Sequence, residues 1–250
     1  MASNYATSVT WDGHELHDLF VVEQIERPVM GGGSPVTQAI GMTDGVALVG
    51  TRYDAPKVTL TLACVKDSPE EIRQAWATLA GWLHVDGERV LAFGDDDGWF
   101  YSALPQGGVE TTLLGWYGER AKVTFLVPDA RMHALASISR SDVTTVTVDV
   151  PAGRCPVEPT IRMAPATPTD GVFVLTATCG SDVRTMTIPM AQAGELIVYC
   201  EAHQASAGGE PAMVSLDEDF FSLGEGTWTI ERPAGHTGTL TVAWRPARWC

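Results

Sequence analysis

Lysine is scarce in this sequence of 250 residues, where only Lys57, Lys66 and Lys122 occur. The 16 basic residues face 31 acidic ones, which gives a formal net charge of −15. An acidic chain repels the phosphates of nucleic acids and the headgroups of anionic membranes. We therefore expect no nucleic-acid partner and no role on an anionic membrane surface.

Long apolar runs are also missing, and no stretch approaches the ~20 apolar residues of a membrane span. The beginning, MASNYATSVTWDG, has neither the basic segment nor the apolar core of a secretory signal. We expect a soluble chain without membrane insertion. The five cysteines, Cys64, Cys155, Cys179, Cys200 and Cys250, form no C-x-x-C pair, so they indicate neither a disulfide framework nor a zinc knuckle. We expect reduced cysteines that behave as small apolar residues, with Cys250 exposed.

Catalytic motifs are absent as well. The sequence has no G-x-S-x-G, no G-x-G-x-x-G, no Walker lysine and no H-E-x-x-H. We therefore predict no enzyme, no cofactor and no metal ion, and we assign no catalytic, cofactor-binding or metal-ligating residue.

Weak candidates for chemistry each have a simpler interpretation. His14 and His17 could share a helix face as metal ligands, but they follow an Asp-Gly turn without a helix start, which favours a surface turn. Asp95, Asp96 and Asp97 lack the alternate spacing of a calcium loop, which favours a hairpin tip. The glycine-rich residues 27–36 precede no Gly-Lys-Ser/Thr, which favours a mobile loop or arm over a phosphate cradle.

Two further sets of side chains leave glycan chemistry open. The carboxylates Asp217, Glu218 and Asp219 could supply a glycosidase pair, which only a spatial separation can decide. Tryptophans could stack on sugars, although most lie on apparent strand faces, where a core or interface role is favoured; they are Trp99, Trp116, Trp228, Trp244 and Trp249. The remaining histidines, His84, His133, His203 and His236, are isolated from one another in sequence.

The clearest element in the sequence is a helix over residues 68–83. Ser68 and Glu71 have the spacing of a capping box, and Pro69 occupies the first helical position. One apolar stripe follows at helical spacing, formed by Ile72, Ala75, Trp76, Leu79, Trp82 and Leu83. Almost all other segments alternate at period two, so we predict one helix that covers a sheet in a mainly β protein.

Strands are expected on both sides of this helix. Residues 8–11 and 19–25 flank an Asp12-Gly13 turn and suggest an antiparallel start. Residues 38–53 contain an Asp44-Gly45 turn between short apolar runs, and residues 58–64 alternate most clearly. Two hairpins follow the helix, residues 89–93 with 99–104, and residues 111–116 with 121–127 around Tyr117-Gly118.

A boundary is expected between Asp129 and Asp142, where residues 130–140 are weakly helical at best. We predict a first domain over residues 1–136 and a second over residues 137–250. The second contains eight short strands separated by turn residues, which argue for a β-sandwich or jelly roll. They are residues 143–150, 160–163, 172–178, 183–188, 195–199, 212–216, 227–231 and 239–244.

The order of these elements resembles siphophage distal tail proteins. It runs from a W-D-G strand through a Pro/Gly loop, the turn at residues 41–45, an alternating strand and a Trp-bearing helix to "LAFGDD" and "VTFLVPDA". The second half agrees, with "FFSLGEGTWTIE" from Phe220 and the ending "LTVAWRPARW". Two departures are Met42-Thr43, where the family usually has a basic residue, and the unusual glycine content of residues 31–33.

The resemblance implies a structural component of the virion and no catalysis. It implies a first domain that is a β-sandwich or barrel with one helix, six copies of which form a ring at the end of a non-contractile tail. It implies a galectin-like second domain outside the ring, and synthesis in the bacterial cytoplasm. The partners it implies are the tail tube protein, the tape measure protein, a tail-associated tip or lysin protein, and a receptor-binding protein or host glycan. Residues 38–53 and the neighbouring loop are plausible donors to a heterologous ring interface.

Two other functions stay open on the sequence alone. One is a carbohydrate-binding, lectin-like module that recognises glycans of the host cell envelope through the second domain. The other is a glycan-cleaving enzyme, which depends only on the abundance of carboxylates.

Overall fold

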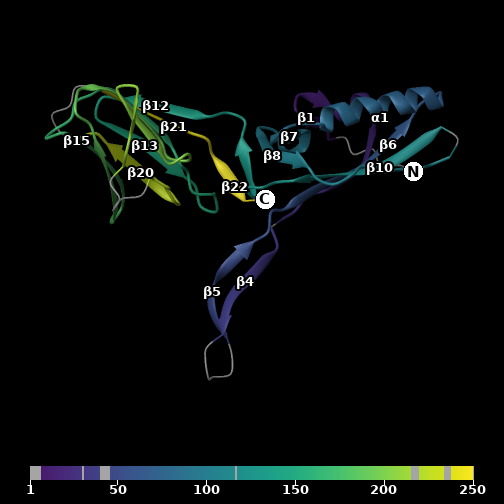
Figure 1. The fold of residues 1–250 in the computed structure, drawn as a ribbon, viewed down its shortest axis with the longest axis horizontal. Coiled ribbons are helices and arrows are strands. Elements are labelled where there is room, and N and C mark those ends of the chain that lie inside the picture. The colour runs from purple at the N-terminus through teal and green to yellow at the C-terminus, as the bar shows by residue number, and fades with distance from the viewer. Residues whose placement is uncertain are drawn as a thin grey trace. The chain divides into compact units, whose positions relative to one another are not determined.

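The computed structural model describes residues 7–29, 31–39, 46–115, 117–214, 220–233 and 238–249. Within these ranges the chain is built from strands and one α-helix (Figure 1), which confirms the prediction of a mainly β protein. The chain divides into two compact units, Met1–His133 with Trp249–Cys250, and Ala134–Arg248. The predicted boundary at residues 136 and 137 stays a prediction.

The first unit contains one large antiparallel sheet. Its strand order is β2-β1-β7-β8-β10-β6-β3. The bounds are β1 Val9–Trp11, β2 His14–Glu15, β3 Val21–Glu26, β6 Lys57–Val65, β7 Arg89–Phe93, β8 Trp99–Pro105 and β10 Gly118–Leu126. Off this path, β9 (Thr111–Leu113) pairs with β10, and β11 (Arg131–Ala134) pairs with β8 and with β22 (Ala247–Trp249).

The antiparallel start differs from the expectation. The turn at Asp12-Gly13 joins β1 to the two-residue strand β2, and the other neighbour of β1 is β7, where Val9 lies opposite Phe93. The strand predicted at residues 19–25 forms as β3 and pairs instead with β6. The nine residues of β6 offer β3 a longer ladder than the three residues of β1 can, and strand pairing over this sequence distance has no local signal.

The helix α1 (Pro69–Leu83) confirms the prediction almost to the residue. Ser68 is its N-cap, and its side chain accepts a hydrogen bond of 3.3 Å from the backbone N–H of Glu71. Ile72, Ala75 and Leu79 are buried on one side of the helix. They join a core cluster with residues from the sheet, among them Val9, Trp11, Leu60, Leu62, Leu91, Tyr101, Val123 and Phe125. The helix therefore covers the sheet, as its apolar stripe indicated.

The other elements of the first unit follow their turn signals, with one exception. β7 pairs with β8 across a 3₁₀ turn at Gly94–Asp96, and β9 pairs with β10 ahead of Gly118. Trp116 lies outside the described residues. The exception is the stretch from residue 130 to 140, which we expected to be weakly helical and which contains the strands β11 and β12 (Ile138–Asp142). Pairing with distant strands decides its conformation, because β11 pairs with β8 and β22, and β12 pairs with β21.

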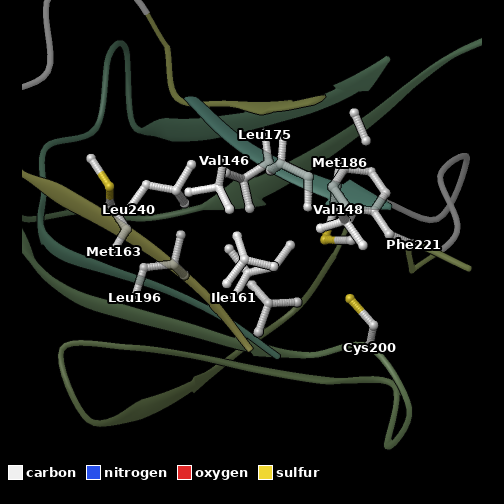
Figure 2. Packing of buried hydrophobic residues seen from close by; sticks show 14 of the residues in the cluster. Val146, Val148, Ile161, Met163, Leu175, Met186, Leu196, Cys200, Phe221 and Leu240 are labelled. Atoms are coloured by element: carbon white, nitrogen blue, oxygen red, sulfur yellow. The ribbon is translucent and has the colours of Figure 1, made fainter. Parts of the chain in front are cut away.

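The second unit is a sandwich of two sheets. The larger sheet has the order β12-β21-β14-β17-β18-β19 and the smaller one β13-β20-β15-β16. The remaining bounds are β13 Thr145–Val150, β14 Thr160–Ala166, β15 Val172–Cys179, β16 Asp182–Pro189, β17 Gly194–Tyr199, β18 Gln204–Ala207, β19 Glu210–Ala212, β20 Gly226–Glu231 and β21 Thr239–Trp244. Figure 2 shows side chains from both sheets in one core, including Val146, Val148, Ile161, Met163, Leu175 and Leu240.

Seven of the eight strands predicted here form close to their expected positions. The eighth was expected at residues 212–216, but β19 ends at Ala212, and residues 215 and 216 lie outside the described ranges. Sequence patterns missed β12, β18 and β22. β18 and β22 are only four and three residues long, too short to show a period, whereas all five residues of β12 are exposed and show no apolar alternation.

A separate two-stranded sheet completes the first unit. β4 (Gly33–Ala39) and β5 (Val46–Tyr53) pair with each other and join no other sheet within the described residues (Figure 1). The loop predicted over residues 27–36 is therefore wrong from Gly33 onward, and the alternative of an arm describes it better. The turn predicted at Asp44-Gly45 lies outside the described residues.

Candidate assembly surface

The histidine pair proposed as a weak metal site is not arranged as one. His14 lies in β2 and stacks on Trp82, with ring centroids 4.5 Å apart. His17 lies in a 3₁₀ turn, and its Nε2 is 2.8 Å from the backbone oxygen of Thr7. The two rings thus have different neighbours. No group of three or more potential metal ligands occurs in the part of the chain that the structure describes.

The acidic candidates have different outcomes. Asp95 and Asp96 lie in the turn between β7 and β8, as a hairpin tip predicts. The Asp95 carboxylate forms an ion pair with Arg27, with Nη2 and Oδ2 2.5 Å apart. The set Asp217, Glu218 and Asp219 lies outside the described residues, as do His236 and Cys250.

Cysteine and tryptophan side chains contribute mainly to packing. Cys64, Cys155 and Cys200 are buried, and no described cysteine forms a disulfide. Burial raises the pKa of the Cys200 thiol to about 12, so that thiol stays protonated at neutral pH. Trp228 and Trp244 lie in the core of the second unit, whereas Trp249 is 57% exposed, with the guanidinium of Arg131 5.7 Å from its ring centroid.

The arm, which we define as β4 and β5, exposes four aliphatic side chains. Val46, Leu48 and Val49 on β5 are exposed to 60%, 66% and 63%, and Val36 on β4 to 46%. An isolated two-stranded hairpin is marginally stable in water, because it has no second layer against which to bury such side chains. Contiguous exposed apolar side chains mark a surface that a partner covers.

The register of the arm divides its exposed apolar side chains between the two faces. Pro35 lies opposite Thr51, and Thr37 lies opposite Leu48. The pairing shifts by one residue between these positions, at Val49, so that Leu48 shares a face with Pro35 and Thr37. The opposite face carries Val36 as well as the polar pair of Ser34 and Arg52. Both faces of the arm therefore offer apolar surface.

The arm follows two paired strands of the main sheet along the chain. Glu26 at the end of β3 lies opposite Thr59 of β6, and a few residues further the N–H of Asp54 donates to the carbonyl of Gly32 over 2.8 Å. Gly31 lies at this neck, where a Cβ atom would come within 2.4 Å of the Asp54 carbonyl oxygen. A glycine is therefore required for the two chain segments to approach each other here.

Arg27 anchors the base of the arm to the main sheet. Besides its ion pair with Asp95, its guanidinium lies 4.2 Å from the ring centroid of Phe93. A cation over an aromatic face is attracted to it, and more strongly when partly shielded from water. The sequence pattern around Asp95 indicated only a turn, because Arg27 is 68 residues away and nothing local links the two.

Charge is nearly absent from the arm itself. Arg52 is the one charged residue of the two strands. Depletion of charge together with exposed aliphatic side chains is typical of the centre of a protein–protein interface. The arm can thus bury area against another protein, and it offers no arrangement for bond chemistry.

Comparisons with known proteins agree with this architecture. Residues 13–127 match the model of the phage tail protein RIFT-related domain, and residues 152–249 match the siphovirus-type tail component, C-terminal domain. The chain is thus a phage tail component. It belongs to the siphophage distal tail protein family, and as such it is a structural protein of the virion.

Solved structures show a similar fold. One is the Dit protein of phage SPP1, which is described as a paradigm of the hub adsorption apparatus in phages that infect Gram-positive bacteria. It matches with a TM-score of 0.73 and 15% sequence identity, and the match covers 96% of this chain and 99% of that chain. A chain of the phage P2 baseplate in its activated conformation matches with a TM-score of 0.48 and 8% identity over 98% of both chains, too distant to support an argument. No curated protein matches. Among the described residues, no helix has the length and apolar character needed to cross a membrane.

Proposed function

We propose that six copies of this chain close into a ring hub at the distal end of a long non-contractile phage tail. In this proposal residues 1–136 form the ring, and residues 137–250 form a galectin-like domain on its outside. The role is mechanical and non-catalytic. The ring joins the tail tube to the tip, with the tail tube protein, the tape measure protein and a tail-associated tip or lysin protein as neighbours, and a receptor-binding protein or host glycan as a further contact. The protein is made in the cytoplasm of the bacterial host.

The observation that carries this proposal is the arm. It exposes Val46, Leu48 and Val49 while carrying a single charge, and it has no second layer of its own. A ring requires a heterologous interface, in which one surface of a subunit docks on a different surface of the next. The arm supplies one such surface, and the body of the neighbouring first domain supplies the other.

Excision of the arm tests the proposal. The N–H of Asp54 and the carbonyl of Gly32 are hydrogen-bonded at the neck, so residues 33–53 can be replaced by a short Gly-Ser turn without displacing β3 or β6. We expect the intact chain to form a hexamer by native mass spectrometry and a ring with a central hole in electron micrographs. The excised variant is expected to remain folded by circular dichroism and to be monomeric.

Two results would contradict the proposal. One is an intact chain that stays monomeric at concentrations well above those of tail assembly and binds to glycan arrays, which would favour the lectin-like function. The other is an excised variant that still forms the ring, which would place the interface elsewhere.

A further inference from the structure

The two outer edges of the arm are not equivalent. Pro35 of β4 lies opposite Thr51 of β5. Proline has no N–H, so this pair cannot exchange the two hydrogen bonds of a hydrogen-bonded antiparallel pair. It is therefore a non-hydrogen-bonded pair, in which the backbone groups of both residues point away from the partner strand. At this level the outer edge of β4 has no donor, whereas the outer edge of β5 presents the N–H of Thr51.

Proline on an edge is a device that blocks the addition of another strand. Only β4 carries one in the middle of its edge. All eight residues of β5 keep their N–H groups. The arm is thus closed to strand addition on one side and open on the other.

The neighbouring main sheet shows what is missing on the open side. In the body, β6 is paired on both sides, with β3 along one edge and with β10 along the other. The ladder with β10 runs to Lys57, and the N–H of Val127 then donates to the carbonyl of Pro56 over 2.9 Å. On the other side of Pro56 the chain comes from β5, which within the described residues pairs with β4 alone. The sheet therefore loses one strand where it passes from the body into the arm.

We infer that a strand of a second copy of this chain adds to the outer edge of β5 and occupies, along the arm, the position that β10 occupies along β6. The donor is the open edge of β3 in that copy. This inference rests on the proposed ring and names the backbone groups that close it.

Length selects β3 as the donor among the open edges of the first unit's sheet. Within the described residues this sheet ends at β2, with two residues, and at β3, with six. β9 and β22 pair there with one strand each and have three residues apiece. Pairing of β5 with β3 joins two different surfaces, as a closed ring requires.

Two matched proline variants test the inference. Thr51→Pro removes an outward N–H from β5. Thr37→Pro removes an outward N–H from β4, because Thr37 lies two residues from Pro35 on the same unbroken strand. Neither substitution removes a hydrogen bond between β4 and β5, so both variants should fold, which circular dichroism and thermal melting check. We expect Thr51→Pro to weaken ring formation by at least about tenfold in subunit concentration, and Thr37→Pro to assemble like the unmodified chain.

Hydrogen exchange provides a second readout. In the assembled protein the amides of residues 46–53 and of residues 21–26 are expected to exchange about tenfold or more slowly than in the monomeric Thr51→Pro variant. The inference is overturned if both proline variants lose assembly, or if neither does. It is also overturned if the ring forms without added protection at β3. These results do not contradict the proposal that the unmodified chain forms a ring. Failure of the unmodified chain to form any ring overturns the proposed function instead.

Discussion

Truncation of Leu48 to alanine should weaken assembly without weakening the subunit. The side chain of Leu48 is 66% exposed on the arm. Complete burial of a leucine side chain contributes ~1.5–3 kcal/mol, so covering the exposed part contributes about 1–2 kcal/mol at each subunit interface. Loss of that contribution lowers the association constant of one interface about 5- to 30-fold. In a closed ring each copy makes this contact once, so the effect on the hexamer is larger than on a single pair.

The assay for this prediction combines association with stability. Sedimentation equilibrium over a range of concentrations gives the association constant, and urea unfolding at a concentration where the chain is monomeric gives the free energy of unfolding. A matched control is Leu113→Ala on β9, because Leu113 is 75% exposed in the same unit but outside the arm. We expect Leu48→Ala to lower association and to leave the free energy of unfolding within about 0.5 kcal/mol, as for other surface substitutions.

The result that would refute this reasoning is equal weakening of association by Leu48→Ala and Leu113→Ala. A clear loss of subunit stability in Leu48→Ala would refute it too, because it would mean that the arm packs within its own subunit.

The remaining predictions concern the neck, the helix cap and a buried thiol. Gly31→Ala brings a Cβ atom within 2.4 Å of the Asp54 carbonyl oxygen, so we expect a loss of ~1–3 kcal/mol in the free energy of unfolding and weaker assembly, measured by urea unfolding and sedimentation. Ser68→Ala removes the acceptor for the Glu71 N–H and should cost ~1 kcal/mol in urea unfolding. Burial raises the pKa of Cys200 to about 12, so iodoacetamide should not alkylate it in the folded chain at pH 8 and should do so in urea, as mass spectrometry of peptides would show. Because the folded-state pKa lies above the unfolded value, the stabilising effect of the protonated thiol is present below pH 9 and is lost as the pH rises from 9 towards 12.

Local signals in the sequence were sufficient for the helix and for most hairpins. The cap at Ser68, the proline at position 69 and the apolar stripe all lie within one segment, so the sequence predicts the bounds of α1 closely. The same holds for β7 and β8, whose connecting turn contains Asp95 and its neighbours. In each case the signal that defines the element lies within or next to it in the sequence, although the helix itself packs on distant strands.

Pairing between distant strands could not be predicted in the same way. Residues 19–25 show a strand pattern, but nothing in them distinguishes β1 from β6 as a partner. The stretch from residue 130 to 140 has no clear period, and only its distant partners make it extended. Strand position can thus be inferred from alternation, while sheet order depends on which edges are left open by the rest of the fold.

The candidate assembly surface was predicted in part. Glycine and proline between residues 27 and 36 indicated a break, and the structure shows that a strand begins inside that segment at Gly33. The alternation of Val46 and Leu48 is the same for a strand that packs in a core and for one that packs against another subunit. Only exposure in the folded chain separates the two cases, and sequence contains no measure of exposure.

The continuity of the arm with β3 and β6 has a mechanical consequence. β3 leads into β4 and β5 leads into β6, so a pull on the arm is passed to two strands that pair with each other in the main sheet. β6 is also paired with β10 along its other edge, so two ladders of hydrogen bonds share the load. The arm is thus attached through a nine-residue strand that the main sheet holds on both sides.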